Sequence, residues 1–147
     1  MREHMGLFHG KRIDTGEWVE GFFIVGTDCV FPGRAFICER IYVAFDDDDE
    51  LTLGGFIEVD PDTISECTSR KDKNGKLIFE GDIVRCGTGR ICKVTFFTSP
   101  GVSGFDLVAI GGIDAPPPHN WVLFADTEII GNIYDNKNLL SGQEVEE

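Results

Sequence analysis

Long hydrophobic runs are missing from this chain of 147 residues. No apolar stretch approaches the roughly 20 residues that a membrane-spanning helix needs. The first six residues lead into no apolar core of a signal peptide, so we expect no secretory signal. The chain also lacks a Cys-x-x-Cys pair, and its five cysteines are an odd number. These absences favour reduced thiols and predict a cytoplasmic protein.

Motifs for catalysis and for cofactor binding are missing as well. Ser103 lies in Gly-Val-Ser-Gly, which lacks the Gly-x-Ser-x-Gly spacing of a nucleophile elbow. Cys86 and Cys92 alternate with no histidine, so we expect small buried side chains rather than zinc ligands. The glycines at 87 and 89 precede no predicted helix and continue into neither a dinucleotide nor a P-loop fingerprint. The sequence therefore predicts a noncatalytic protein with no cofactor and no metal.

Basic side chains are scarce, since 13 Lys and Arg stand against 26 Asp and Glu and give a net charge of −13. Residues 1–69 carry 5 basic and 15 acidic side chains, a net charge of −10, whereas residues 70–147 carry 8 and 11, a net charge of −3. Within the second half, residues 70–93 hold seven basic and three acidic side chains and are locally +4. The charge is polarised along the sequence.

This polarity leaves several partners open. The basic segment, with Arg70, Lys71, Lys73 and Lys76 at its start, is the strongest candidate for a binding surface. Lysines on a hairpin contact phosphates, and small barrels often bind nucleic acid in their loops, but the overall negative charge repels a polyanion. The acidic half could instead mimic DNA and occupy a host protein. Attraction between the acidic half of one copy and the basic segment of another would give a homo-oligomer.

The acidic run Asp46–Glu50 is a candidate cation site, because hard cations prefer carboxylate oxygens. An EF-hand loop beginning at Asp46 needs glycine where Leu51 stands and glutamate where Ile57 stands. Neither requirement is met. We expect a solvated turn, and cation binding by this run is left open.

Runs of β-branched and aromatic residues bounded by Gly, Pro and Asp predict strands through most of the chain. In residues 35–45 apolar side chains occupy both parities, so this strand should be central and covered on both faces. Helical structure is expected only as a turn at 63–66 and a short helix capped by Asp135. The predicted strands span residues 18–25, 35–45, 56–59, 77–79, 83–86, 91–97, 105–110, 121–124 and 128–134.

After residue 67 the strands are short and separated by glycine-rich turns, which favours a small closed barrel because closure removes exposed sheet edges. Two tight turns flank the first of these strands. Asn74-Gly75 tolerates positive φ at both central positions of a hairpin turn. Glu80-Gly81-Asp82 could present two carboxylates at a binding mouth, but turn chemistry alone requires these residue types, so we read it as structural. The predicted barrel core comprises Ile78, Phe79, Ile83, Val84, Ile91, Val94, Phe96, Ile130 and Ile133.

The stretch 68–84, TSRKDKNGKLIFEGDIV, resembles the best-preserved part of the YopX family of phage and prophage proteins, T-G-L-K-D-x-N-G-K-x-I-Y-E-G-D-I-V. Further matches are GKR at 10–12 with GEWV at 16–19, EVDPDT at 58–63 and IGNIY at 130–134. The departure is Ser69-Arg70, where the family usually has Gly-Leu, and it concerns the local turn. The resemblance implies an all-β fold with an SH3-type barrel and a family of uncharacterised function.

We therefore predict an all-β protein with a strand-rich lobe at 1–66, an SH3-like barrel at 67–140 and an acidic disordered tail at 141–147. The resemblance implies a phage or prophage accessory protein in a bacterial host cell, and the missing catalytic motifs favour protein–protein contact. Trp18 and Trp121 each begin an apolar strand. We expect them to anchor the core or the two lobes, with an aromatic binding groove as the alternative.

Overall fold

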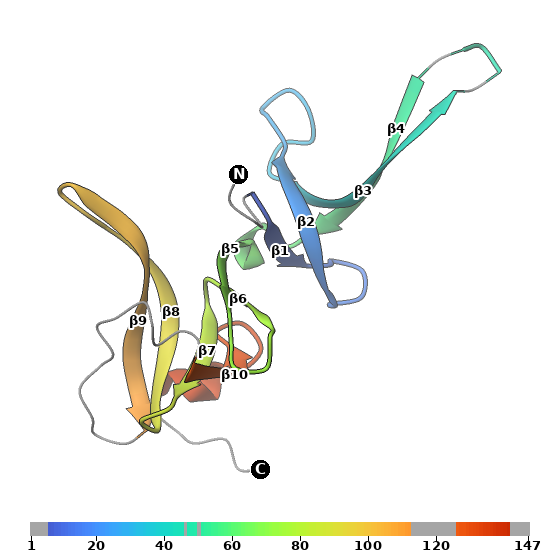
Figure 1. Ribbon diagram of the computed structural model, residues 1–147. Coiled ribbons are helices and arrows are strands. Elements are labelled where there is room, and N and C mark those ends of the chain that lie inside the picture. Colours follow the sequence, from blue (N-terminus) through green and yellow to red (C-terminus); the bar gives the residue numbers. More distant parts are fainter. Residues whose placement is uncertain (1–5, 46, 50, 113–125, 142–147) are drawn as a thin grey trace. The chain divides into compact units, whose positions relative to one another are not determined.

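The computed structural model describes residues 6–45, 47–49, 51–112 and 126–141, and it confirms the predicted all-β class (Figure 1). Every pair of neighbouring strands is antiparallel. No helix in the described part of the chain has the length and hydrophobicity that a membrane crossing needs. The strands are β1 (Phe8–Lys11), β2 (Trp18–Val25), β3 (Ala35–Phe45), β4 (Leu51–Val59), β5 (Ser65–Lys71), β6 (Leu77–Phe79), β7 (Asp82–Cys86), β8 (Arg90–Ser99), β9 (Val102–Gly112) and β10 (Thr127–Asn132).

The chain divides into two compact units, Met1–Glu66 and Cys67–Glu147. In unit 1 the strands follow the order β4-β3-β2-β1, and the first residues of β5 pair with β1. The core lies on one face of this sheet, where Val19, Ala35, Ile37 and Val59 are buried. Alternation explains this, because directly paired residues of antiparallel strands share a face.

The helical turn expected at 63–66 is wrong. The structure instead has a 3₁₀ turn, η1 (Pro61–Thr63), and β5 already begins at Ser65. Proline opens the turn because its fixed φ suits a first helical position, and the Asp60 side chain caps it by accepting the N–H of Asp62 at 3.0 Å. The Asp-Pro signal therefore starts a turn rather than only ending a strand.

Unit 2 contains a four-stranded sheet in the order β10-β7-β8-β9, and the remaining part of β5 pairs with β6. One core cluster gathers Ile78, Val84, Cys86, Cys92, Val94 and Leu107, and a second gathers Ile83, Ile91 and Leu139. The prediction that Phe96 belongs to the barrel core is wrong, since this residue is 47% exposed. Ile130 and Ile133 are half-buried and pack against the second cluster.

Closure of unit 2 into an SH3-like barrel stays a prediction, because residues 113–125 lie outside the described part of the chain. The predicted strand 121–124 and Trp121 lie in this segment. Residues 142–147 of the predicted tail are likewise outside it. The terminal helix expected after Asp135 is the 3₁₀ turn η3 (Lys137–Ser141).

Candidate interaction surface

The second face of the β2–β3–β4 sheet exposes several large apolar side chains. Phe22 pairs with Cys38 and Cys38 with Phe56, so these three side chains share a face, and Ile24 joins them through its partner Phe36. Phe22, Ile24 and Phe56 are 65%, 44% and 43% exposed. β3 is central, as predicted, and its residues on this face are partly covered, since Cys38 is buried and Phe36 is half-buried. The neighbouring residues on β2 and β4 are the ones that stand open.

The loop between β2 and β3 folds back on itself beside this face. The N–H of Gly26 donates to the carbonyl of Arg34 at 2.8 Å, and the N–H of Arg34 donates to the carbonyl of Phe31 at 3.1 Å. Phe31 adopts a φ of +49°, which is uncommon outside glycine, and its ring is 54% exposed. The loop thus holds an aromatic ring at the surface despite a backbone strain of about 1–3 kcal/mol.

The open face and this loop enclose a groove of about 390 Å³. Its volume lies within the range of roughly 300–1,000 Å³ that is typical of binding pockets. Thr27 is the single polar side chain among the lining residues, and apolar surface of this kind marks interaction sites. We call this the apolar groove, and it is lined by Ile24, Val25, Gly26, Thr27, Val30, Phe31, Phe36 and Phe56.

Arg34 holds the two aromatic rings of the groove in place. Its guanidinium donates to both carboxylate oxygens of Glu58, from Nε at 2.7 Å and from Nη2 at 2.8 Å. The guanidinium carbon lies 4.9 Å from the ring centroid of Phe31 and 5.2 Å from that of Phe36. The hydrogen bond with Glu58 raises the pKa of Arg34 and lowers the pKa of Glu58. The Arg34 guanidinium therefore already has a carboxylate and two aromatic rings of the same protein as partners.

The predicted basic surface lies on the β5–β6 hairpin. Arg70, Lys71 and Lys76 are exposed there. The ammonium of Lys73 lies 3.2 Å from the Glu128 carboxylate on β10. Such a surface pair contributes little to stability, but it removes one of the four cations from the surface available to phosphate.

Asp72 lies inside the same hairpin and is buried. Its Oδ1 accepts the backbone N–H of Asn74 and of Lys76, each at 2.9 Å, and its Oδ2 accepts that of Ile129 at 3.1 Å. Burial alone would raise the pKa of Asp72, but these three donors outweigh it and hold the pKa below 3.8. The carboxylate therefore ties the Asn74-Gly75 turn to β10.

The second turn, Glu80-Gly81-Asp82, also bends the backbone. Gly81 has a φ of +88°, its N–H donates to the carbonyl of Val94 at 2.8 Å, and its carbonyl accepts the N–H of Ile133 at 2.9 Å. The buried Asp82 accepts the N–H of Phe79 at 2.8 Å. Glu80 is half-buried. The hydrogen bonds of this turn thus connect it to β8 and to the residue that follows β10, within unit 2.

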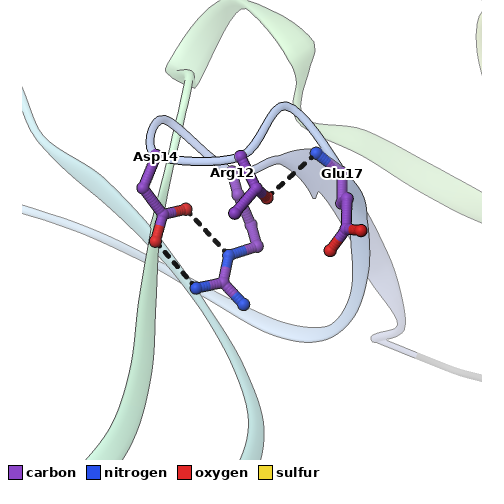
Figure 2. A network of polar contacts seen from close by, with 4 residues as sticks. Arg12, Asp14 and Glu17 are labelled. Carbon is purple, nitrogen blue, oxygen red and sulfur yellow. Dashed lines mark hydrogen bonds and ion pairs between the residues drawn. The ribbon is translucent and has the colours of Figure 1, made fainter.

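Trp18 lies away from the apolar groove, on the β1–β2 hairpin. Its ring stacks on His9 with centroids 4.3 Å apart. The turn before it is closed by the N–H of Arg12, which donates to the carbonyl of Glu17 at 2.9 Å. Figure 2 shows the Arg12 guanidinium meeting both oxygens of Asp14, at 2.9 and 2.8 Å. The hydrogen bond with Asp14 raises the pKa of Arg12, and the pair stiffens an exposed turn.

Within the described residues, no group of three or more His, Cys, Asp and Glu side chains could hold a metal ion. Asp47, Asp48 and Asp49 are exposed, and the two ends of the acidic run, Asp46 and Glu50, lie outside the description. Cys86 and Cys92 are buried with their sulfurs 3.8 Å apart. The hydrogen bond between them, together with burial, raises the pKa of Cys92. Both thiols behave as core side chains.

Cys29 provides a reporter beside the groove. It is exposed in the β2–β3 loop, whereas Cys38, Cys67, Cys86 and Cys92 are buried. We expect the native protein to react rapidly with a thiol reagent such as Ellman's reagent at one site, and the urea-unfolded protein to react at all five. Mass spectrometry of the modified peptides checks the site. Rapid reaction of two or more thiols in the native protein would contradict this burial pattern.

A model of the YopX protein family matches residues 36–141, more than two thirds of the chain. A search of curated proteins gives no match. The matched range contains the β5–β6 hairpin and two groove residues, Phe36 and Phe56. The other lining residues precede it: Ile24, Val25, Gly26, Thr27, Val30 and Phe31. The match therefore spans one side of the groove and begins after its loop.

Proposed function

Because the chain belongs to the YopX protein family, we propose that it is a noncatalytic phage or prophage accessory protein that binds another protein through the apolar groove. We place it in the cytoplasm of the bacterial host. The observation that carries the proposal is the groove itself, a concave and exposed surface lined by side chains that are almost all apolar. Desolvating such a surface favours association with a complementary protein.

The composition of the groove supports binding rather than catalysis. A reaction centre needs a nucleophile, an acid or a base within reach of its substrate. The lining residues supply one hydroxyl, that of Thr27, and no titratable side chain. At the rim, Arg34 is committed to Glu58 and to the rings of Phe31 and Phe36. These contacts orient the aromatic walls and leave an apolar contact surface.

A capture experiment tests the proposal. Immobilised wild-type protein should retain a specific partner from a bacterial host lysate, and Val30→Glu should reduce its recovery about tenfold or more, because a buried charge at an interface centre is costly. Val30 is exposed, so the substitution should leave the fold intact. Quantitative mass spectrometry measures recovery, and circular dichroism checks folding.

Ile13→Glu is the matched control, because Ile13 is equally apolar and exposed but lies on the β1–β2 turn outside the groove. It should retain the partner as the wild type does. Equal recovery by Val30→Glu would overturn the proposal. Binding of oligonucleotides that is lost when Lys71, Lys73 and Lys76 are reversed to glutamate would instead assign the function to the basic hairpin.

A further inference from the structure

We infer that the apolar groove of one copy receives the β8–β9 arm of a second copy of this chain. We define the arm as residues 95–105, the outer part of the β8–β9 hairpin. The inference rests on the proposed function, since it names the occupant of the groove. It is carried by the geometry of the arm, by its lack of charge and by the charge of the two units.

The arm extends beyond the strand that supports its base. β7 pairs with β8 at residues 91–93, whereas β9 pairs with β8 along residues 90–99 (Figure 1). The cross-strand pair Val94 and Leu107 is buried in the core of unit 2. Phe96 and Phe105 form the next pair on the same face, yet Phe96 is 47% exposed. The apolar face of the sheet thus continues past the core.

The exposed end of the arm offers anchors that suit the groove. The rings of Phe96 and Phe105 meet edge to face, with centroids 5.3 Å apart. This contact holds the Phe96 ring in place. Val102, at the turn and on the opposite face of the hairpin, is exposed as well. Aromatic side chains held in place are the usual anchors of protein interfaces, because their burial costs little conformational entropy.

Charge selects this occupant over the other apolar surfaces of a second copy. Residues 94–105 contain no Asp, Glu, Lys or Arg and are the longest uncharged stretch of the chain. The groove belongs to residues 1–66, which carry 5 basic and 15 acidic side chains, a net charge of −10. Two such units repel each other, which disfavours a groove-to-groove dimer. The arm meets no such repulsion, and the segment before it, residues 70–93, is locally +4.

An arm-in-groove contact joins two different surfaces, and each copy offers both of them. Every copy can then bind one neighbour through its groove and another through its arm. Such contacts build a reciprocal dimer, in which each arm lies in the partner's groove, or a closed ring or an open chain of copies.

Sedimentation velocity over a wide range of protein concentrations tests the inference. The wild type should form dimers or larger species as concentration rises. Val30→Glu in the groove and Phe96→Ser in the arm should each weaken this association about tenfold or more. Val102→Glu provides a second arm variant that leaves the Phe96–Phe105 contact in place. The controls Ile13→Glu and Leu140→Ser change exposed apolar residues elsewhere and should associate as the wild type does.

Mixing the two defective variants gives the sharpest result. Val30→Glu keeps an intact arm and Phe96→Ser keeps an intact groove, so an equimolar mixture should form a one-to-one heterodimer that grows no further. A dye on Cys29, the exposed thiol of the groove loop, should report the same event. Its emission should shift when unlabelled Val30→Glu is added to labelled Phe96→Ser.

Three results would overturn the inference: a wild type that stays monomeric at every concentration, a Phe96→Ser variant that associates normally, or a mixture of the two variants that stays monomeric. These outcomes are separable from failure of the proposed function. If the wild type is monomeric but Val30→Glu still loses a lysate partner that Ile13→Glu retains, the groove binds a different protein. If Val30→Glu loses neither self-association nor a partner, the groove has no binding role.

Discussion

Replacing Asp72 by alanine is expected to lower the free energy of unfolding of unit 2 by about 3 kcal/mol. The substitution removes the acceptor of three backbone N–H groups, those of Asn74, Lys76 and Ile129. Each of these bonds is partly buried, and a donor left without an acceptor costs roughly 1–3 kcal/mol when no water replaces it. Urea unfolding followed by circular dichroism measures the change.

Two further variants make this result specific. Asp72→Asn keeps one carbonyl oxygen and should cost less than Asp72→Ala, because Oδ1 alone accepts two of the three bonds. Lys73→Ala removes the neighbouring surface pair with Glu128 and should change stability by less than about 1 kcal/mol. If Asp72→Ala were no more destabilising than Lys73→Ala, the carboxylate would not be what ties the hairpin to β10.

The stabilisation by Asp72 should also depend on pH and should weaken in acid. The folded state holds the pKa of Asp72 below its ordinary value of 3.8. The stabilisation is therefore complete above pH 3.8 and is lost as the pH falls through the lower folded value. The difference in unfolding free energy between wild type and Asp72→Ala should be constant near neutral pH and should narrow in this acid range.

Gly26→Ala is expected to have the second large effect, at the apolar groove. A methyl group at Gly26 would overlap the carbonyl oxygen of Phe31, a backbone atom that cannot move without opening the loop. We expect unit 1 to lose about 2 kcal/mol or more of stability, as in other overpacked sites, and groove binding to fall with it. Thermal unfolding and the capture experiment measure the two effects.

Gly33→Ala is the matched control in the same loop. Gly33 has a φ of +71°, but no atom lies within 4 Å of the position that a methyl group would take. Its cost should be that of the left-handed backbone alone, about 1–2 kcal/mol, with partner binding retained. Equal loss of binding in both variants would mean that the loop tolerates no substitution, and the overlap at Gly26 would not explain the result.

The strand pattern could be predicted from the sequence because it depends on local composition. Residues 18–25 and 35–45 were predicted as strands and are β2 and β3 with the same bounds. β-branched and aromatic runs ending at Gly, Pro or Asp suffice for this. β5, Ser65–Lys71, was missed because polar and apolar residues alternate little in its sequence, SECTSRK, and because it follows a helical signal. Its place depends on pairing with β1 and β6, which are distant in sequence.

The apolar groove could not be predicted, because an apolar run does not say whether another element covers it. Phe22 and Ile24 are as apolar as core residues, and only the structure shows that they are 65% and 44% exposed. The contacts that shape the site are also long-range. Arg34 and Glu58 are 24 residues apart, and Asp72 and Ile129 are 57 apart. One local signal was present in the motif. An Asp two residues before Asn-Gly is placed to accept backbone N–H groups of the turn, as Asp72 does.

The family model matches one part of the groove and not the other. Its floor includes Phe36 and Phe56, which lie inside the stretch that the family model matches, while its outer loop lies before that stretch. The loop closes through backbone bonds between Gly26 and Arg34, so other side chains could occupy it without altering the strands that it joins. If the groove binds a partner, as we propose, replacing the loop side chains would change which partner it binds while the sheet keeps its fold.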